Sequence, residues 1–261
     1  MGRNWNYFKA NFKLMWINTI EYKTNLYTSL AILIIYSVIG LLSFILIGDI
    51  FDEYIDWEVA DFVIFYVLQY FVGIIAGFFS WGKELHYTLT QGNLNQFLTK
   101  PLNPFIGYIF HTLTGWQLIS AIFRFFLLIA VFIYFKIVPQ NILLVILIIL
   151  LINILVFVIH QFLESLEFIK YKLSSIGDSY WEFTEVFYTN PAPLFQRFPV
   201  KTLLYLWEFY YTGLLLVPLI RGYEITNFGI HFYPLVGFIV LFGIGTLINW
   251  HYGLKKYEAY N

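Results

Sequence analysis

Six long apolar stretches constrain the fold of this chain more than any other feature. Each has roughly the 20 residues that a helix needs to cross the hydrocarbon core of a membrane. Because backbone groups inside a bilayer must be satisfied within their own segment, such stretches fold as helices. The sequence therefore predicts an all-α, polytopic membrane protein that forms a single transmembrane domain over residues 1–261 with six transmembrane helices. The predicted spans cover residues 26–47, 62–81, 113–135, 142–162, 202–220 and 232–250.

Composition agrees with this fold class. Charged residues make up 12% of the chain and hydrophobic residues 60%, whereas a soluble domain has about 25% charged residues. The chain contains no cysteine, which excludes disulfides, thiolate catalysis and cysteine-based metal sites.

Basic residues lie almost entirely in the connections that fall on one side of the predicted spans. Cytoplasmic loops carry an excess of Lys and Arg, so both termini of this multi-pass membrane protein are expected in the cytoplasm. Of the 15 basic residues, Lys136 and Arg221 fall on the other side and Arg124 inside a span. The opposite face carries an acidic loop formed by Asp49, Asp52, Glu53, Asp56, Glu58 and Asp61. The remaining basic residues are Arg3, Lys9, Lys13, Lys23, Lys83, Lys100, Lys170, Lys172, Arg197, Lys201, Lys255 and Lys256.

The N-terminal residues 3–24 have the pattern of an amphipathic helix. Basic residues and Glu21 occupy the remaining surface, so the helix is expected to lie in the cytoplasmic interface of the membrane. Packing against another subunit is the alternative. The apolar residues that recur at helical spacing are Trp5, Phe8, Phe12, Met15, Trp16 and Ile20.

The connection between the second and third spans, residues 83–112, contains a candidate docking element. Asn93 is expected to cap a short helix with Gln96 at the capping-box position. Leu94, Phe97 and Leu98 would then form one apolar face, before Pro101 ends the helix. This face would dock a soluble partner, although an ordinary loop at the membrane surface has the same pattern.

A second connection, residues 165–201, predicts a further short helix. Ser179 and Glu182 have capping-box spacing, and the helix is expected to end near Tyr188. Three prolines follow before the fifth span and prevent regular helix there.

Motifs for catalysis and phosphate binding are absent from the sequence. It has no Gly-rich phosphate loop and no metalloprotease or nucleophile-elbow motif. His160, Glu164 and Glu167 are one turn apart at the end of the fourth span, where an interfacial polar cluster is favoured over a metal site.

Two charges inside predicted spans, Arg124 and Glu208, need a partner or a cavity because charge within a bilayer is costly. Both fall in the inner to middle part of the membrane. Two interpretations are equally favoured: a structural role, as a mutual ion pair or as a contact between subunits, and a polar lining for a translocation path.

Short motifs distributed over the chain resemble those of permeases of the type-2 ABC exporter family, in its six-span branch of about 260 residues. The resemblance rests on Gly92, Leu94, Phe97, Leu98, Lys100, Pro101 and Leu102 after the second span, on residues 253–259 at the C-terminus, and on Pro199, Lys201 and Pro218 around the fifth span. Residues 221–231 are short, in contrast to better-known relatives that have re-entrant helices there.

The resemblance implies a permease subunit that is not itself an enzyme. It would pair with a second permease, either the same chain or a sister, and with a separate ATP-binding subunit that holds ATP and Mg²⁺. Residues 3–24 would be the connecting helix, and the loop around residues 94–102 the coupling helix. Nucleic acid is not an expected partner.

Two other function classes remain open from the sequence. A polytopic membrane enzyme acting on lipids would concentrate acid, base or metal-binding groups at one membrane depth. The only acidic concentration is the loop at residues 49–61, which contains no histidine. A membrane adaptor without transport activity is the third class. The substrate and the number of different permease chains do not follow from the sequence.

Overall fold

The computed structural model describes residues 2–51, 57–79, 84–100, 103–169, 174–188, 201–225 and 227–259. Within these ranges the chain consists of helices and their connections, with no β-strand. The prediction of an all-α polytopic membrane protein is confirmed, because five helices are long and apolar enough to cross a membrane. They are α2 (Lys23–Phe51), the pair α3 (Val59–Gln69) and α4 (Ile74–Phe79), α8 (Gly115–Tyr134), α9 (Ile142–Ser165) with η1 (Leu166–Phe168), and α13 (Phe228–Ala259).

The predicted fifth span, residues 202–220, is not one continuous helix. It is divided into η3 (Lys201–Leu206), α11 (Glu208–Tyr211), the π-helical η4 (Thr212–Leu216) and α12 (Val217–Arg221). Trp207 interrupts it, with extended dihedral angles of φ −112° and ψ 139°. The uninterrupted part, residues 208–221, spans only about 21 Å at 1.5 Å per residue, less than the ~30 Å hydrocarbon core.

This interrupted segment lies in the interior of the helix bundle. From Glu208 to Val217 every residue is buried, and the segment contacts α3, α9 and α13. Irregular backbone at membrane depth is tolerated where protein surrounds it. Hydropathy predicts this apolar character correctly, but it cannot distinguish a helix facing lipid from one enclosed by other helices.

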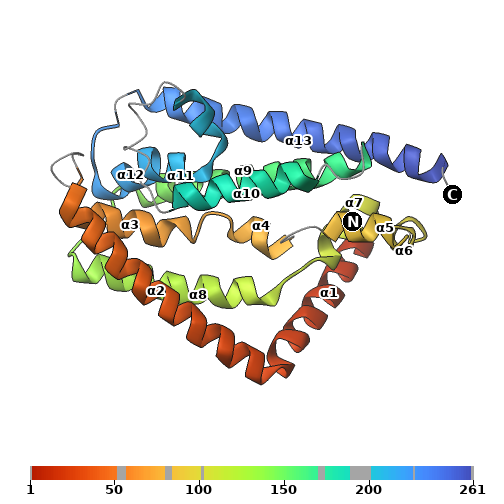
Figure 1. The fold of residues 1–261 in the computed structure, drawn as a ribbon, viewed down its shortest axis with the longest axis horizontal. Helices are drawn as coiled ribbons and strands as arrows, with labels where there is room; N and C mark the ends of the chain where they lie inside the picture. The colour runs from red at the N-terminus through yellow and green to blue at the C-terminus, as the bar shows by residue number, and fades with distance from the viewer. Residues whose placement is uncertain are drawn as a thin grey trace.

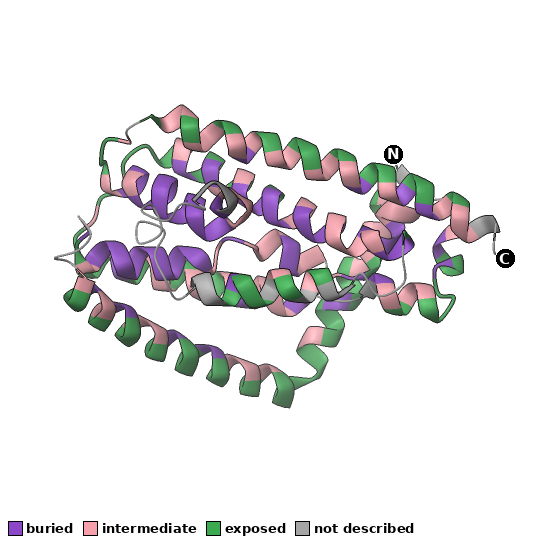
Figure 2. Ribbon diagram, turned by 45° about the horizontal axis from the view of Figure 1, so that its top comes forward, coloured by how far each residue is buried: buried purple, intermediate pink, exposed green. Residues whose placement is uncertain are grey.

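The bundle is organised around α9. Its neighbour α13 runs beside it, and α4, α10 (Ser174–Tyr188) and α11 also contact it (Figure 1). The long helix α2 packs against α3 near its own C-terminal end and diverges from the bundle toward its first residues. Figure 2 shows the consequence, since α2 is exposed along most of its length while buried residues concentrate inside the bundle.

The amphipathic N-terminal helix is α1 (Gly2–Glu21), slightly shorter than the predicted range of residues 3–24. It meets α2 at a sharp angle and contacts α7 (Pro104–His111) (Figure 1). Phe8 packs on Phe110 with ring centroids 5.0 Å apart, and Met15 is buried. Trp5, Trp16 and Ile20 are exposed in this single chain. An interfacial position for α1 stays a prediction.

Short helices gather at one end of the bundle, where both ends of the described chain also lie (Figure 1). They are α5 (Glu84–Thr90), α6 (Asn95–Leu98) and α7. A cytoplasmic position for this end is an expectation from charge. Elsewhere, α10 confirms a helix ending at Tyr188, but it begins at Ser174, so Ser179 lies inside the helix and is not its N-cap.

Candidate functional site

A break divides the second predicted span into α3 and α4. Residues 70–73 leave the helix, and Gly73 has a positive φ of 93°, a conformation that L side chains rarely adopt. The amide groups of Phe71 and Val72 both donate to the carbonyl of Leu68, at 2.8 and 3.1 Å, which ends α3. The span predicted over residues 62–81 corresponds to a candidate span at Val59–Phe79, but these four residues interrupt its helix.

The side chain of Asn153, on α9, bonds to the backbone groups that this break releases. Its Oδ1 accepts hydrogen bonds from the amides of Gly73 and Ile75, both at 3.1 Å. Its Nδ2 donates to the carbonyls of Phe71 at 3.0 Å and Ile149 at 2.9 Å. Asn153 is buried. One amide side chain thus supplies the bonds that an uninterrupted helix would have made for itself.

Arg124 approaches the same break from α8. Its Nη1 donates to the carbonyl oxygen of Tyr70 at 3.3 Å, and its guanidinium carbon lies 4.2 Å from the centroid of the Tyr70 ring. The Tyr70 hydroxyl donates to the Tyr66 hydroxyl at 3.1 Å, which donates in turn to the carbonyl of Tyr36 on α2 at 3.2 Å. A chain of polar contacts therefore joins α8, the broken helix and α2.

These groups line a cavity of about 930 Å³ between α2, the broken helix and α8. Gln69, the last residue of α3, lines it and is almost completely buried. Neither amide atom of Gln69 has a hydrogen-bond partner in the part of the chain that the structure describes. The other polar side chains of the lining are Tyr36, Ser43, Tyr66, Tyr70, Thr114, Gln117, Ser120, Arg124 and Glu185.

Glu208, the second predicted intramembrane charge, lies in a different environment. It is buried at the start of α11, where its carboxylate accepts a hydrogen bond from the Tyr180 hydroxyl at 3.5 Å. Arg124 contacts Tyr70 instead, and no ion pair joins the two charges, both of which the structure describes. Of the interpretations left open by the sequence, the mutual pair is not formed, and a contact between subunits stays a prediction. Arg124 lines a cavity.

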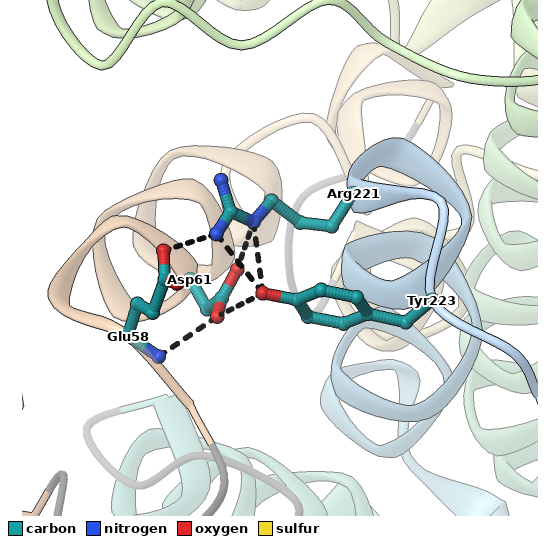
Figure 3. Close-up of polar contacts among 4 residues, drawn as sticks. All are labelled: Glu58, Asp61, Arg221 and Tyr223. Carbon is teal, nitrogen blue, oxygen red and sulfur yellow. Dashed lines mark hydrogen bonds and ion pairs between the residues drawn. The ribbon is translucent and has the colours of Figure 1, made fainter.

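A polar cluster lies at the end of the bundle that is opposite to α6 (Figure 3). Arg221 at the end of α12 pairs with Asp61 of α3, Nε to Oδ1 at 2.8 Å, and with Glu58. The Tyr223 hydroxyl accepts from Arg221 at 2.9 Å and donates to Asp61 at 3.2 Å. Burial alone would lower the pKa of Arg221, but Tyr223 and the two carboxylates raise it above its ordinary value. These contacts hold the end of α12, and with it the buried segment of residues 208–217, against α3.

The predicted docking face on α6 is wrong in its orientation. Leu94 and Phe97 are fully buried and Leu98 is half-buried, so they do not present an apolar face to a partner. Phe97 lies 5.5 Å from the ring of His111 and 6.3 Å from that of Tyr108, both on α7. A four-residue helix in a loop has too little backbone stability of its own, so its apolar residues fold back onto α7.

The rest of the predicted coupling loop is partly described. The short helix is confirmed, but its N-cap is Leu94 rather than Asn93, and Leu94 makes no side-chain cap bond. Gly92 is exposed with φ 70°. Lys100 places its Nζ 5.1 Å above the ring of Tyr7 on α1 and 5.5 Å from that of Phe97. Pro101 and Leu102 lie outside the described residues. The exposed surface of the loop is polar and consists of Gln91, Gly92, Asn93, Asn95, Gln96 and Thr99.

Aromatic rings join this loop to the C-terminal helix. Trp250 of α13 lies 5.4 Å from Tyr108, 5.0 Å from Phe105 and 5.0 Å from Phe168, measured between ring centroids. The Tyr108 hydroxyl also donates to Glu164 of α9 at 2.8 Å. The loop is thereby held against both α9 and α13.

The predicted polar cluster at the end of the fourth span is distributed over several contacts. Glu164 binds Tyr108, Glu167 lies 3.1 Å from Nδ1 of His86 on α5, and His160 is buried. Among the residues that the structure describes, no group of three metal-binding side chains is brought together.

Sequence reasoning missed Asn153, Gln69 and Gly73. A signal was present for the first two, because each is an isolated amide within a long apolar stretch, and a polar residue inside a membrane needs a partner. Gly73 gave less indication, since glycine is common in transmembrane helices.

Comparison with known proteins agrees with the architecture. No curated protein matches the chain. The family model described as ABC-2 family transporter protein matches residues 31–260, which include every long apolar helix except the first residues of α2. Members of this family are the membrane components of transporters and are not themselves catalytic. The chain therefore belongs to the ABC-2 family of transporter proteins and is the membrane permease of an ABC transporter.

Proposed function

We propose that this chain is the permease subunit of an ATP-driven exporter in a prokaryotic cell membrane. It forms half of the translocation pathway together with a second permease, either the same chain or a sister. A separate ATP-binding subunit holds ATP and Mg²⁺. The observation that carries the proposal is the family match over residues 31–260. It is supported by a set of short helices, α5 to α7, at one end of the bundle.

The ATP-binding subunit docks on the exposed polar residues of the loop around α6, which we call the tip. Asn93, Asn95 and Gln96 are exposed there, and amide side chains both donate and accept hydrogen bonds. Leu94 and Phe97 are buried beneath them, so they fix the tip to the bundle and do not touch the partner. This arrangement suits a coupling element, because a docked tip transmits displacement only if its base is rigid.

Two routes lead from the tip into the membrane domain. One passes from Phe97 through Tyr108 to Trp250 on α13. The other passes from Lys100 to Tyr7 on α1 by a cation–π contact. A push on the loop by the ATP-binding subunit would therefore reach both the connecting helix and the last span.

The first experiment is affinity purification of the chain from its native membranes in mild detergent, with identification of the co-purifying subunits. The proposal expects a soluble subunit with a phosphate-binding loop. ATP hydrolysis by the recovered complex is then compared for Gln96→Arg, at the tip, and Gln140→Arg. Gln140 is an exposed glutamine near Gly222, at the opposite end of the bundle.

Loss of hydrolysis and of co-purification with Gln96→Arg, but not with Gln140→Arg, would support docking at the tip. Equal behaviour of the two variants in an intact complex would refute the docking surface while keeping the transporter. Failure to recover any ATP-binding subunit from native membranes in several detergents would contradict the proposed function itself.

A further inference from the structure

The wall of the cavity beside the broken helix contains a buried polar side chain, the amide of Gln69. Gln69 is 1% exposed and lines the cavity, and neither of its amide atoms is bonded within the described residues. A buried amide without a partner costs free energy, and native proteins retain few of them. A polar ligand in the cavity would supply the missing hydrogen bonds.

Arg124 brings a positive charge to the same cavity, deep in the membrane. It lies nine residues beyond Gly115, the first residue of α8, which is roughly 14 Å along the helix axis. With the hydrocarbon core entered at the first residue of α8, as the sequence predicts for this span, Arg124 lies close to the middle of a core about 30 Å thick. The other charge of the lining, Glu185 on α10, is exposed, whereas Arg124 is half-buried. A planar guanidinium at this depth is suited to a phosphate group.

Part of the cavity wall is formed by α2, which packs against α3 on one side and is exposed along much of its length (Figure 2). Along α2, Tyr36 and Ile39 line the cavity and are still 67% and 55% exposed. The next turn contributes Ser43 and Phe44. The cavity is therefore bordered by a helix at the periphery of the bundle, where hydrocarbon chains of the bilayer can lie beside it.

We propose that this cavity binds a phosphate-bearing amphiphile from the bilayer, with the phosphate at Arg124 and Gln69 and the hydrocarbon chains along α2. A lipid held only at the membrane surface would not bring its headgroup to the middle of the bilayer. The amphiphile is therefore the class of molecule that the permease carries. This last step rests on the proposed transport function, whereas the binding step does not.

Binding is tested on the purified full-length chain without any ATP-binding subunit. The chain contains no cysteine, so Ser43→Cys provides a single thiol in the cavity. Its rate of alkylation by a maleimide is measured in neutral detergent with phosphatidylglycerol, with diacylglycerol, or with glycerol phosphate. Phosphatidylglycerol should slow alkylation at concentrations where the other two, which lack either the phosphate or the chains, do not.

Two substitutions then test the polar groups in the Ser43→Cys background. Arg124→Gln should weaken protection by phosphatidylglycerol by about tenfold, the loss expected for one charge-assisted hydrogen bond. Gln69→Leu removes an amide that is bonded to nothing in the described chain, so it should keep or raise the unfolding temperature while also weakening protection. Lys255→Gln, an exposed cation at the far end of α13, should change neither and controls for general attraction to anionic lipid.

Equal protection by phosphatidylglycerol and diacylglycerol, unaffected by Arg124→Gln, would overturn the proposal and assign the cavity to apolar chains alone. Disulfide-linked dimers of Ser43→Cys that block alkylation without lipid would overturn it differently, since a second copy of the chain would then cover the cavity. Neither result concerns the ATP-binding subunit, so failure of this proposal is distinguishable from failure of the proposed function.

Discussion

Replacing Asn153 by Leu removes the side chain that forms hydrogen bonds with the free backbone groups at the break between α3 and α4. Leucine has a similar size and suits an apolar helix, so the change deletes hydrogen bonds with little change in volume. The amides of Gly73 and Ile75 and the carbonyl of Phe71 each lose the bond that Asn153 provides. The fourth bond, to Ile149, lies within α9 itself.

The expected loss of stability follows from these three backbone groups. Interhelical hydrogen bonds measured in membranes average about 0.6 kcal/mol each, which gives about 2 kcal/mol as a lower value. A buried backbone group left unsatisfied costs about 1–3 kcal/mol, which gives up to about 9 kcal/mol for three. Partial rearrangement of the four-residue turn relieves some of this cost, so we expect a decrease of about 3–5 kcal/mol in the free energy of unfolding.

The assay is equilibrium unfolding in mixed micelles, followed by helical circular dichroism. Asn249→Leu is the matched control, because Asn249 donates one hydrogen bond, to the Ser165 hydroxyl at 3.0 Å, and touches no helix break. It should cost about 1 kcal/mol or less. If Asn153→Leu costs no more than Asn249→Leu, Asn153 does not hold the break and the account of the cavity wall is refuted.

Three further substitutions test the packing around the cavity and the polar cluster around Arg221. Gly73→Ala should lower the stability measured by thermal unfolding by about 1–2 kcal/mol because of the positive φ. Gly243→Ala, with open space at its Cβ, should be neutral or slightly stabilising in the same measurement. Gly40→Ala should separate α2 from α3, because the added Cβ would lie 1.9 Å from the Tyr66 hydroxyl, and cost about 1–3 kcal/mol in thermal unfolding. Arg221→Gln should lower the free energy of unfolding by up to about 3–5 kcal/mol, because it leaves the buried Asp61 carboxylate without its cation. Adding Asp61→Asn should recover part of this loss, and a double variant as unstable as Arg221→Gln would contradict this explanation.

Much of the fold follows from the sequence because a bilayer accepts few structures. Long apolar runs must become helices, and the five confirmed long helices reflect that constraint. Hydropathy sums side chains and is insensitive to backbone continuity, so it predicts spans over residues 62–81 and 202–220 without showing that each helix is interrupted. Both differences concern where a helix is interrupted, not whether the segment is apolar.

The candidate site was less predictable than the fold. Amphipathicity shows which face of a helix is apolar, but not what covers that face. On α6 the pattern of Leu94 and Phe97 was read as a docking surface, whereas both side chains are buried against the protein. Arg124 was identified from the cost of charge in a membrane. Its contact with the carbonyl of Tyr70 depends on the break, which hydropathy does not detect.

The two interruptions are stabilised in the same way, although they lie on different helices. At the first, Asn153 binds the amides and a carbonyl of residues 71–75. At the second, the Tyr211 hydroxyl donates to the carbonyl of Tyr205 at 2.7 Å, and the Tyr180 hydroxyl lies between the carbonyl of Leu206, at 3.4 Å, and the carboxylate of Glu208. Because lipid cannot satisfy free backbone groups, each break requires polar side chains close by.

Isolated polar residues in apolar stretches therefore indicate that a span is broken, on the same helix or on one packed against it. Asn153 lies on a different helix from the break that it satisfies, so this reading of a sequence requires pairing one helix with another. Gln69 is different, since it lies at a break and its side-chain amide bonds to no described residue. Asn153 already satisfies the backbone there, so the amide of Gln69 is not needed to hold the turn. The ligand that we propose for the cavity would be its partner, which makes Gln69→Leu the substitution that separates binding from stability.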